Sequence, residues 1–216
     1  MELMQELATY VSAHWPRLLG LTVQHLKLAL TAVFYGVLVG VPIGYVISRY
    51  RKLAEPVLWV ANALQTIPAL ALIGFVMLFL GLSPATGIFC LFVYTLMPII
   101  RSTHTAIISL DPALIEAAEG MGMTRWQILR IVQLPLALAV MMVGIRLAVV
   151  MSIGTASIMS LGGAGGLGSE IFAGIDRVQD KMILAGALPA ALLAIFADLG
   201  MGALERWLTP RGLRQA

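Results

Sequence analysis

Residues 116–135 read EAAEGMGMTRWQILRIVQLP and form a polar, glycine-punctuated interruption near the middle of an otherwise apolar chain. The segment carries Glu116, Glu119, Arg125 and Arg130, and it closes on Leu-Pro. On both sides the sequence continues in long runs that contain almost no charge. The segment therefore divides two groups of apolar runs, and its position predicts a polar loop between membrane-spanning segments.

Composition places this chain in a membrane. Of its 216 residues, 60% are hydrophobic and 12% are charged, whereas a soluble domain is about one quarter charged. The mean hydropathy is +0.94. A net charge of +3 without a basic run gives no support for nucleic-acid binding. The single cysteine, Cys90, excludes an internal disulfide, and the acidic N-terminal stretch MELMQELATY is unlike a cleaved signal peptide.

The uncharged runs predict an all-α membrane protein with five transmembrane helices. The run 56–100 contains no charged residue or histidine and is too long for one span, and GLSPATG at 81–87 offers a turn that divides it. Helices are favoured because backbone polar groups must be satisfied within each segment in lipid, and the runs lack the alternation of a β-barrel. The expected spans are about 26–48, 57–80, 86–107, 134–157 and 182–205.

The distribution of basic residues predicts the orientation. Placing the loop 49–55 in the cytoplasm puts nine Lys and Arg residues inside and four outside, which favours an external N-terminus and a cytoplasmic C-terminus. We then expect a transmembrane domain at 26–210, with its loop 108–133 and a tail at 211–216 in the cytoplasm. The inside set is Arg49, Arg51, Lys52, Arg101, Arg125, Arg130, Arg206, Arg211 and Arg214, and the outside set is Arg17, Lys27, Arg177 and Lys181.

The N-terminal segment, residues 1–25, has two interpretations. Leu3, Leu7 and Val11 lie at helical spacing, which predicts a short helix at the membrane interface. A loosely ordered tail is the alternative. Pro16 is expected to end that helix, because proline interrupts a helix interior.

Two glycine patterns have structural interpretations. Gly36, Gly40 and Gly44 share one face of the first span and allow close helix–helix approach, either inside the subunit or at a subunit interface. The run GGAGGLG at 162–168 follows a membrane helix instead of a strand, so it is expected to be an irregular loop and not a nucleotide site.

Two charged residues lie deep in the predicted spans. Arg146 and Asp198 lie at matched depth, roughly 12–15 Å from the cytoplasmic edge. We expect them to form an ion pair, with direct substrate contact as the alternative. No catalytic or metal-binding pattern is present: there is no HExxH, and His14, His25 and His104 are too dispersed for a nucleophile–base arrangement.

A polar stretch within the second span is the candidate lining of a translocation path. QTIP at 65–68 places Gln65, Thr66 and Pro68 at mid-span, where Pro68 is expected to kink the helix. A secondary transporter or channel acting alone remains an alternative function. That alternative predicts internal repeats and ionisable residues at the midplane; no convincing repeat is visible, and Arg146 and Asp198 are the only deep charges.

The polar segment also resembles a known motif. It looks like the EAA loop of permease subunits in binding-protein-dependent ABC importers, with EAA at 116–118, then Gly122, then Val132-x-Leu134-Pro135. Isoleucine is usual in that family at the position of Val132. The resemblance extends over nearly residues 20–210 to the osmoprotectant branch, which imports glycine betaine, choline and carnitine. The similar stretches are 25–49, 62–75, 96–137, 142–175 and 183–210.

This resemblance implies a type I importer permease fold in the bacterial cytoplasmic (inner) membrane and a transport subunit that is not itself an enzyme. It implies a second permease subunit, two cytoplasmic ATPase subunits that bind ATP and Mg, and an external binding protein; no cofactor is expected in this chain. An importer of another small solute, such as an amino acid, is the alternative within the family. The implied coupling residues are Glu116, Ala117, Ala118, Gly122, Arg125, Leu134 and Pro135.

Overall fold

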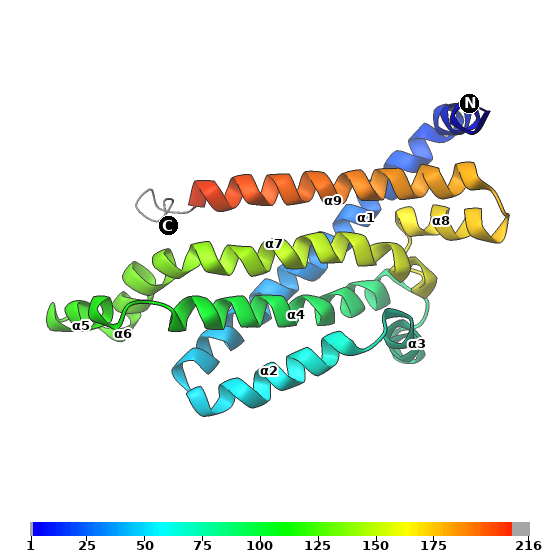
Figure 1. Ribbon diagram of the computed structural model, residues 1–216. Coiled ribbons are helices and arrows are strands. Elements are labelled where there is room, and N and C mark those ends of the chain that lie inside the picture. The colour runs from blue at the N-terminus through cyan, green and yellow to red at the C-terminus, as the bar shows by residue number, and fades with distance from the viewer. Residues whose placement is uncertain (1, 209–216) are drawn as a thin grey trace.

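The computed structural model describes residues 2–208, and the regular elements in that range are all helices. The elements lie side by side as a bundle with two distinct ends (Figure 1). The tail predicted at 211–216 lies outside the described residues. The helices are α1 (Glu2–Arg49), α2 (Arg51–Thr66), α3 (Ala69–Leu80), α4 (Pro84–Ile108), α5 (Pro112–Gly120), α6 (Arg125–Gln127), the π-helix η1 (Ile128–Gln133), α7 (Leu134–Met159), the 3₁₀-helix η2 (Ser160–Gly162), α8 (Leu167–Asp176) and α9 (Asp180–Leu208).

Residues 2–25 are helical but do not form a separate short helix, so the expected end at Pro16 and the alternative of a loosely ordered tail were wrong. Helix α1 runs through 48 residues with Pro16 in its interior. Packing overrides the local effect of proline, because residues on both sides of Pro16 are buried against α9: Leu7 and Leu18 form one cluster with Ala185. At 1.5 Å per residue the helix is about 72 Å long, more than twice the hydrocarbon thickness of a bilayer.

The second predicted span is broken. Instead of one helix at 57–80, the chain forms α2 and α3, which are bent by 95° at Ile67 and Pro68. Proline cannot donate the backbone hydrogen bond that would continue α2, and it drives the preceding Ile67 out of the helical region to ψ 126°. Tyr94 stabilises the break, because its hydroxyl donates to the freed carbonyl of Ile67. The expected kink at Pro68 is confirmed in an extreme form.

The other predicted spans are confirmed, with α4, α7 and α9 long and apolar enough to cross a membrane. Four helices satisfy that criterion among the described residues, or five spans if the bent pair α2–α3 counts as one. Figure 1 shows α5 and α6 at one end of the bundle and α8 at the other, with the N-terminus near α8. We refer to these as the α5 end and the α8 end.

Helix α4 forms the centre of the bundle, packed between α1 and α7. Its Cys90, Leu91 and Ile99 are fully buried. The glycines of α1 make this packing possible: a Cβ at Gly36 would lie 2.1 Å from Thr95 Oγ1, and one at Gly44 would lie 2.6 Å from Thr103 Cβ. Gly36, Gly40 and Gly44 therefore face α4 of the same chain and are not available to a second subunit.

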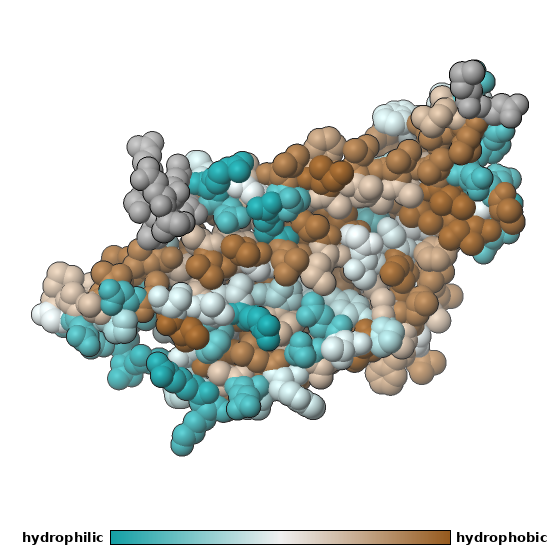
Figure 2. All heavy atoms as spheres, in the orientation of Figure 1, coloured by the Kyte–Doolittle hydropathy of each residue, from teal (hydrophilic) through white to brown (hydrophobic). Residues whose placement is uncertain are grey.

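Much of the outer surface is apolar. Hydrophobic atoms cover much of α9 and of the α8 end, and hydrophilic atoms gather at the α1–α2 turn and on the part of α9 toward the C-terminus (Figure 2). Leu78 and Phe79 of α3 are 79% and 73% exposed. Such surfaces require lipid or another protein as a neighbour.

Candidate functional site

The α5 end carries a short helix whose two termini are both capped. Asp111 accepts a hydrogen bond from the Ala113 amide at 2.9 Å, and Pro112 takes the first helical position. At the other terminus the amides of Gly122 and Met123 donate to the carbonyls of Glu119 and Ala118. Gly122 has φ +78°, the left-handed conformation that glycine adopts at such a helix end. These caps fix the length and direction of α5.

A second cap begins the next helix immediately afterwards. The Thr124 amide donates to Gln127 Oε1 at 2.7 Å, and the Gln127 amide donates to Thr124 Oγ1 at 3.4 Å, which is a capping box. Only Met123 separates this box from the turn at Gly122. Because both turns are tight, the path from α5 to α6 has little freedom to change angle.

Helix α6 continues through η1 into α7 without a break. The π-helical turn precedes Pro135, which lacks the amide that would otherwise donate into the helix. Leu134 then packs with Ala106 of α4 and Met141 of α7. The predicted residues Leu134 and Pro135 thus lie where the polar segment joins the bundle.

The two alanines of α5 have different environments. Ala117 is exposed, but Ala118 is only 1% exposed and is turned into the chain. Of these two implied coupling residues, only Ala117 is therefore accessible to a partner. Sequence reasoning also missed apolar residues that are exposed at the α5 end: Leu114 (46%), Met121 (74%), Trp126 (66%) and Ile131 (61%). Their apolar character within a loop outside the membrane was the signal that could have identified them.

Glu116 lies in a groove of its own chain. The groove holds about 340 Å³ and is formed by the α1–α2 turn, the end of α4, α5 and η1. Arg49 and Arg51 line it opposite Glu116, and Gln133 contributes an amide. Glu116 remains exposed, as does Arg125 on α6. The groove offers a partner both positive and negative groups within one recess.

The candidate path residues lie at the α2–α3 break. Thr66 and Pro68 are exposed and Gln65 is half-buried. The Thr66 hydroxyl donates to the Ala63 carbonyl at 2.7 Å, so it satisfies its own helix. Non-helical backbone at membrane depth is tolerated only where it is covered by protein or lines a water-filled cavity.

The structure brings Arg146 and Asp198 together across α7 and α9. Arg146 Nε and Nη2 donate to the two Asp198 oxygens at 2.6 and 2.7 Å, a bidentate pair. Glu205 Oε2 lies 3.5 Å from Arg146 Nη1 and was missed in the sequence, although its position seven residues beyond Asp198 places it on the same helix face. The side chains of Arg146 and Asp198 are 36% and 41% exposed, so the pair lies on the outer surface of the chain.

The glycine run at 162–168 forms an irregular loop at the α8 end, as expected. Gln24 of α1 holds it with two hydrogen bonds, donating to the Ala164 carbonyl and accepting from the Gly166 amide, each at 3.1 Å. Gly163, Gly165 and Gly166 all have positive φ. The loop is packed inside the bundle, and it has the role of a tight connection.

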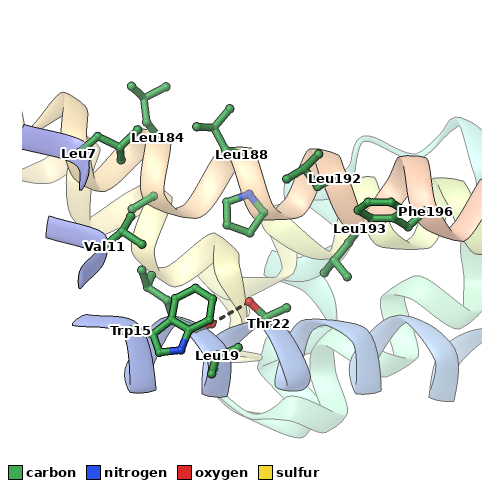
Figure 3. A pocket seen from close by; sticks show the side chains of 13 residues that line it. Leu7, Val11, Trp15, Leu19, Thr22, Leu184, Leu188, Leu192, Leu193 and Phe196 are labelled. Carbon is green, nitrogen blue, oxygen red and sulfur yellow. Dashed lines mark hydrogen bonds between the residues drawn. The ribbon is translucent and has the colours of Figure 1, made fainter. Parts of the chain in front are cut away.

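An apolar groove runs between α1 and α9 (Figure 3). It holds about 350 Å³, and side chains such as Val11, Trp15, Leu188 and Phe196 line it. Its one hydroxyl, on Thr22, donates to the Leu18 carbonyl. No charged side chain lines the groove, and its surface is suited to lipid or to an apolar neighbour.

Comparison with known proteins assigns this chain to a family. Residues 36–211 match the model of the binding-protein-dependent transport system inner membrane component. The chain is 47% identical over 211 residues to the glycine betaine/carnitine/choline transport system permease protein OpuCD of Bacillus subtilis (strain 168), covering 97% of this chain and 92% of that protein. It is 46% identical over 202 residues to the osmoprotectant import permease protein OsmW of Salmonella typhimurium, covering 91% and 94%.

Solved structures agree on the fold. A chain of the MetNI methionine ABC transporter in an inward-facing conformation superimposes with a TM-score of 0.77 at 23% identity, covering 89% of this chain and 96% of that one. A chain of a bacterial alginate ABC transporter, solved with its periplasmic protein, gives 0.63 at 17% identity, covering 96% and 88%. The chain belongs to the binding-protein-dependent permease family and is a multi-pass inner-membrane subunit of an ABC importer.

Proposed function

From this family membership, we propose that the chain is a permease subunit of an ATP-driven importer of osmoprotectants such as glycine betaine, choline and carnitine. The observation that carries the proposal is identity of 38–47% over nearly the whole chain to permeases named for these solutes. The likeness to the methionine transporter, at 23% identity, concerns the fold alone. Transport of methionine or another amino acid is therefore the weaker candidate.

The α5 end is the proposed joint to a cytoplasmic ATPase subunit, which binds ATP and Mg. In this proposal Ala117, Trp126 and Met121 contact the ATPase, and Glu116 and Arg125 add polar contacts. Ala118 has a different role, because it is buried and supports α5 from within. The capped turn at Gly122 and the junction at Pro135 transmit motion of α5 to α7. Exposed apolar and charged side chains on a rigid, capped support suit a protein interface.

The proposed orientation places the α5 end inside and the α8 end outside. The excess of basic residues at the α5 end supports this assignment. The N-terminus is then external. The binding protein meets the α8 end, and the solute moves toward the α5 end.

A second permease subunit, identical or paralogous, and two ATPase subunits complete the proposed transporter. Two features of the outer surface of this chain support a contact with the second permease subunit or a water-filled path beside it. The Arg146–Asp198 pair is exposed at membrane depth, where charges must face protein or water. The α2–α3 break, with Gln65, Thr66 and Pro68, also requires protein or water beside it.

The test is reconstitution of the chain with its ATPase subunit and binding protein in sealed vesicles. Uptake of labelled glycine betaine, choline, carnitine and methionine is measured with and without ATP. We expect ATP-dependent uptake of at least one osmoprotectant and no uptake of methionine. Uptake by the permease alone without ATP would instead favour a secondary transporter or channel, and ATP-dependent uptake of methionine alone would refute the substrate class.

A further inference from the structure

The turn between α8 and α9 contains an unusual backbone conformation. Val178 has φ +54°, and it is the only non-glycine residue with positive φ among residues 2–208. A β-branched side chain is strongly disfavoured in this region, because its Cβ substituents crowd the neighbouring backbone. The turn therefore holds Val178 in a strained state.

The hydrogen bonds of the turn explain which residue would normally stand there. The amides of Val178 and Gln179 donate to the carbonyls of Ile175 and Gly174. This is the same cap that ends α5, in which the left-handed position is taken by Gly122. The chain thus uses glycine in one copy of the motif and valine in the other. Local structure alone would favour glycine in both.

The support beneath the turn is rigid enough to maintain the strain. Glu170 of α8 is fully buried; Arg17 of α1 lies 2.8 Å from its Oε2, and the Tyr10 hydroxyl donates to its Oε1. Gly174 packs directly on α9, since a Cβ there would lie 2.7 Å from the Ile183 amide nitrogen. This part of the molecule therefore presents Val178 in one fixed position, which reduces the ordering cost of binding.

The strained side chain makes almost no contact within the chain. Val178 is 87% exposed and Ile175 is 50% exposed, and they are flanked by the exposed charged residues Asp176, Arg177 and Asp180. Hydrophobic atoms with hydrophilic atoms beside them are visible at the tip of this turn in Figure 2. An apolar centre with a charged rim is the composition of a small protein interface.

Position identifies the partner. The turn lies at the α8 end, opposite the α5 end (Figure 1). We infer that the α8–α9 turn is a docking knob for the external binding protein, and that Val178 enters an apolar recess on that protein. The inference rests on the proposed function and on its orientation. In this inference the Val178 side chain contacts the partner, whereas it makes almost no contact within its own chain.

The test distinguishes the effect of the Val178 side chain on binding from the effect of its backbone conformation. Val178→Gly removes the side chain, and Val178→Asn replaces it with a polar one of similar size; both residues tolerate positive φ, so both should keep the turn. The control is Met4→Asn, because Met4 is an exposed apolar residue (66%) near the N-terminus, which lies at the same end of the molecule. Affinity of the solute-loaded binding protein for the complete transporter is measured in detergent, together with thermal unfolding.

We expect each Val178 variant to weaken binding by about tenfold or more, with an unfolding temperature equal to or above that of the unmodified protein. Met4→Asn should bind normally. Unchanged affinity in Val178→Asn would overturn the inference, and so would an equal loss in Met4→Asn. If the tip of the turn only contacts lipid, the affinity for the binding protein should be unchanged in detergent. If the unmodified transporter neither binds the binding protein nor imports an osmoprotectant, the proposed function fails as well. That outcome differs from a failure of the inference alone, in which the unmodified transporter binds and imports normally.

Discussion

Replacing Gly122 by valine should uncouple ATP hydrolysis from transport without removing the permease from the membrane. Gly122 has φ +78°, and no atom lies within 4 Å of the position that a Cβ would take. The substitution therefore meets no steric neighbour, and its whole effect comes from the backbone. Left-handed conformation costs a non-glycine residue about 1–3 kcal/mol. A cost of about 2 kcal/mol lowers the population of the capped turn by roughly thirtyfold relative to its alternatives.

The consequence is confined to the joint, because the turn lies outside the spans. Without the cap, α5 loses its fixed angle to α6, and motion of the ATPase no longer reaches α7 efficiently. The matched control is Gly120→Val: Gly120 lies two residues earlier, is helical and is equally free of neighbours. Valine is slightly better than glycine in a helix interior, so the control should be neutral.

Three measurements are made on each variant: abundance in the membrane, co-purification of the ATPase subunit, and solute uptake together with ATPase stimulation by loaded binding protein. We expect Gly122→Val to reach normal abundance and to transport poorly, and Gly120→Val to behave as the unmodified protein. Full uptake with stimulated hydrolysis in Gly122→Val would refute the reasoning. Equal impairment of both variants would show that the left-handed turn is not the cause.

Three further predictions concern packing, charge and orientation. Gly36→Val should disrupt assembly of the bundle, because its Cβ would collide with Thr95. The control Gly74→Val should not, because nothing lies within 4 Å of that position. Monodispersity after detergent extraction distinguishes the two variants. Arg146→Ala and Asp198→Ala should each reduce membrane abundance, and the double variant should recover part of the loss; simple addition of the two losses, measured by immunoblot, would contradict the pairing. A cysteine at exposed Asp176 should react with an impermeant thiol reagent outside sealed cells, and one at exposed Glu119 should not. The native Cys90 is buried and should not react. The reverse pattern would invert the proposed orientation.

Hydropathy by itself determined the membrane class, the spans of α4, α7 and α9, and the polar segment at the α5 end. These features are predictable because each depends on the local solvent of a segment, and composition reports that solvent directly. The left-handed turn at Gly122 was predictable for a related reason, since a helix cap depends on a few neighbouring residues. The EAA pattern identified the family because its spacing is long and specific.

Tertiary packing decided the remaining features. Pro16 predicts a helix end locally, yet α1 continues because residues on both sides of it are buried against α9. Pro68 predicts a kink, but the 95° angle depends on contacts such as the hydrogen bond from Tyr94, which lies 27 residues away along the chain. The burial of Ala118 and Glu170 likewise depends on which helix lies beside them. Such contacts join residues distant in sequence, so no local pattern encodes them, and only the folded chain shows which surfaces remain for its partners.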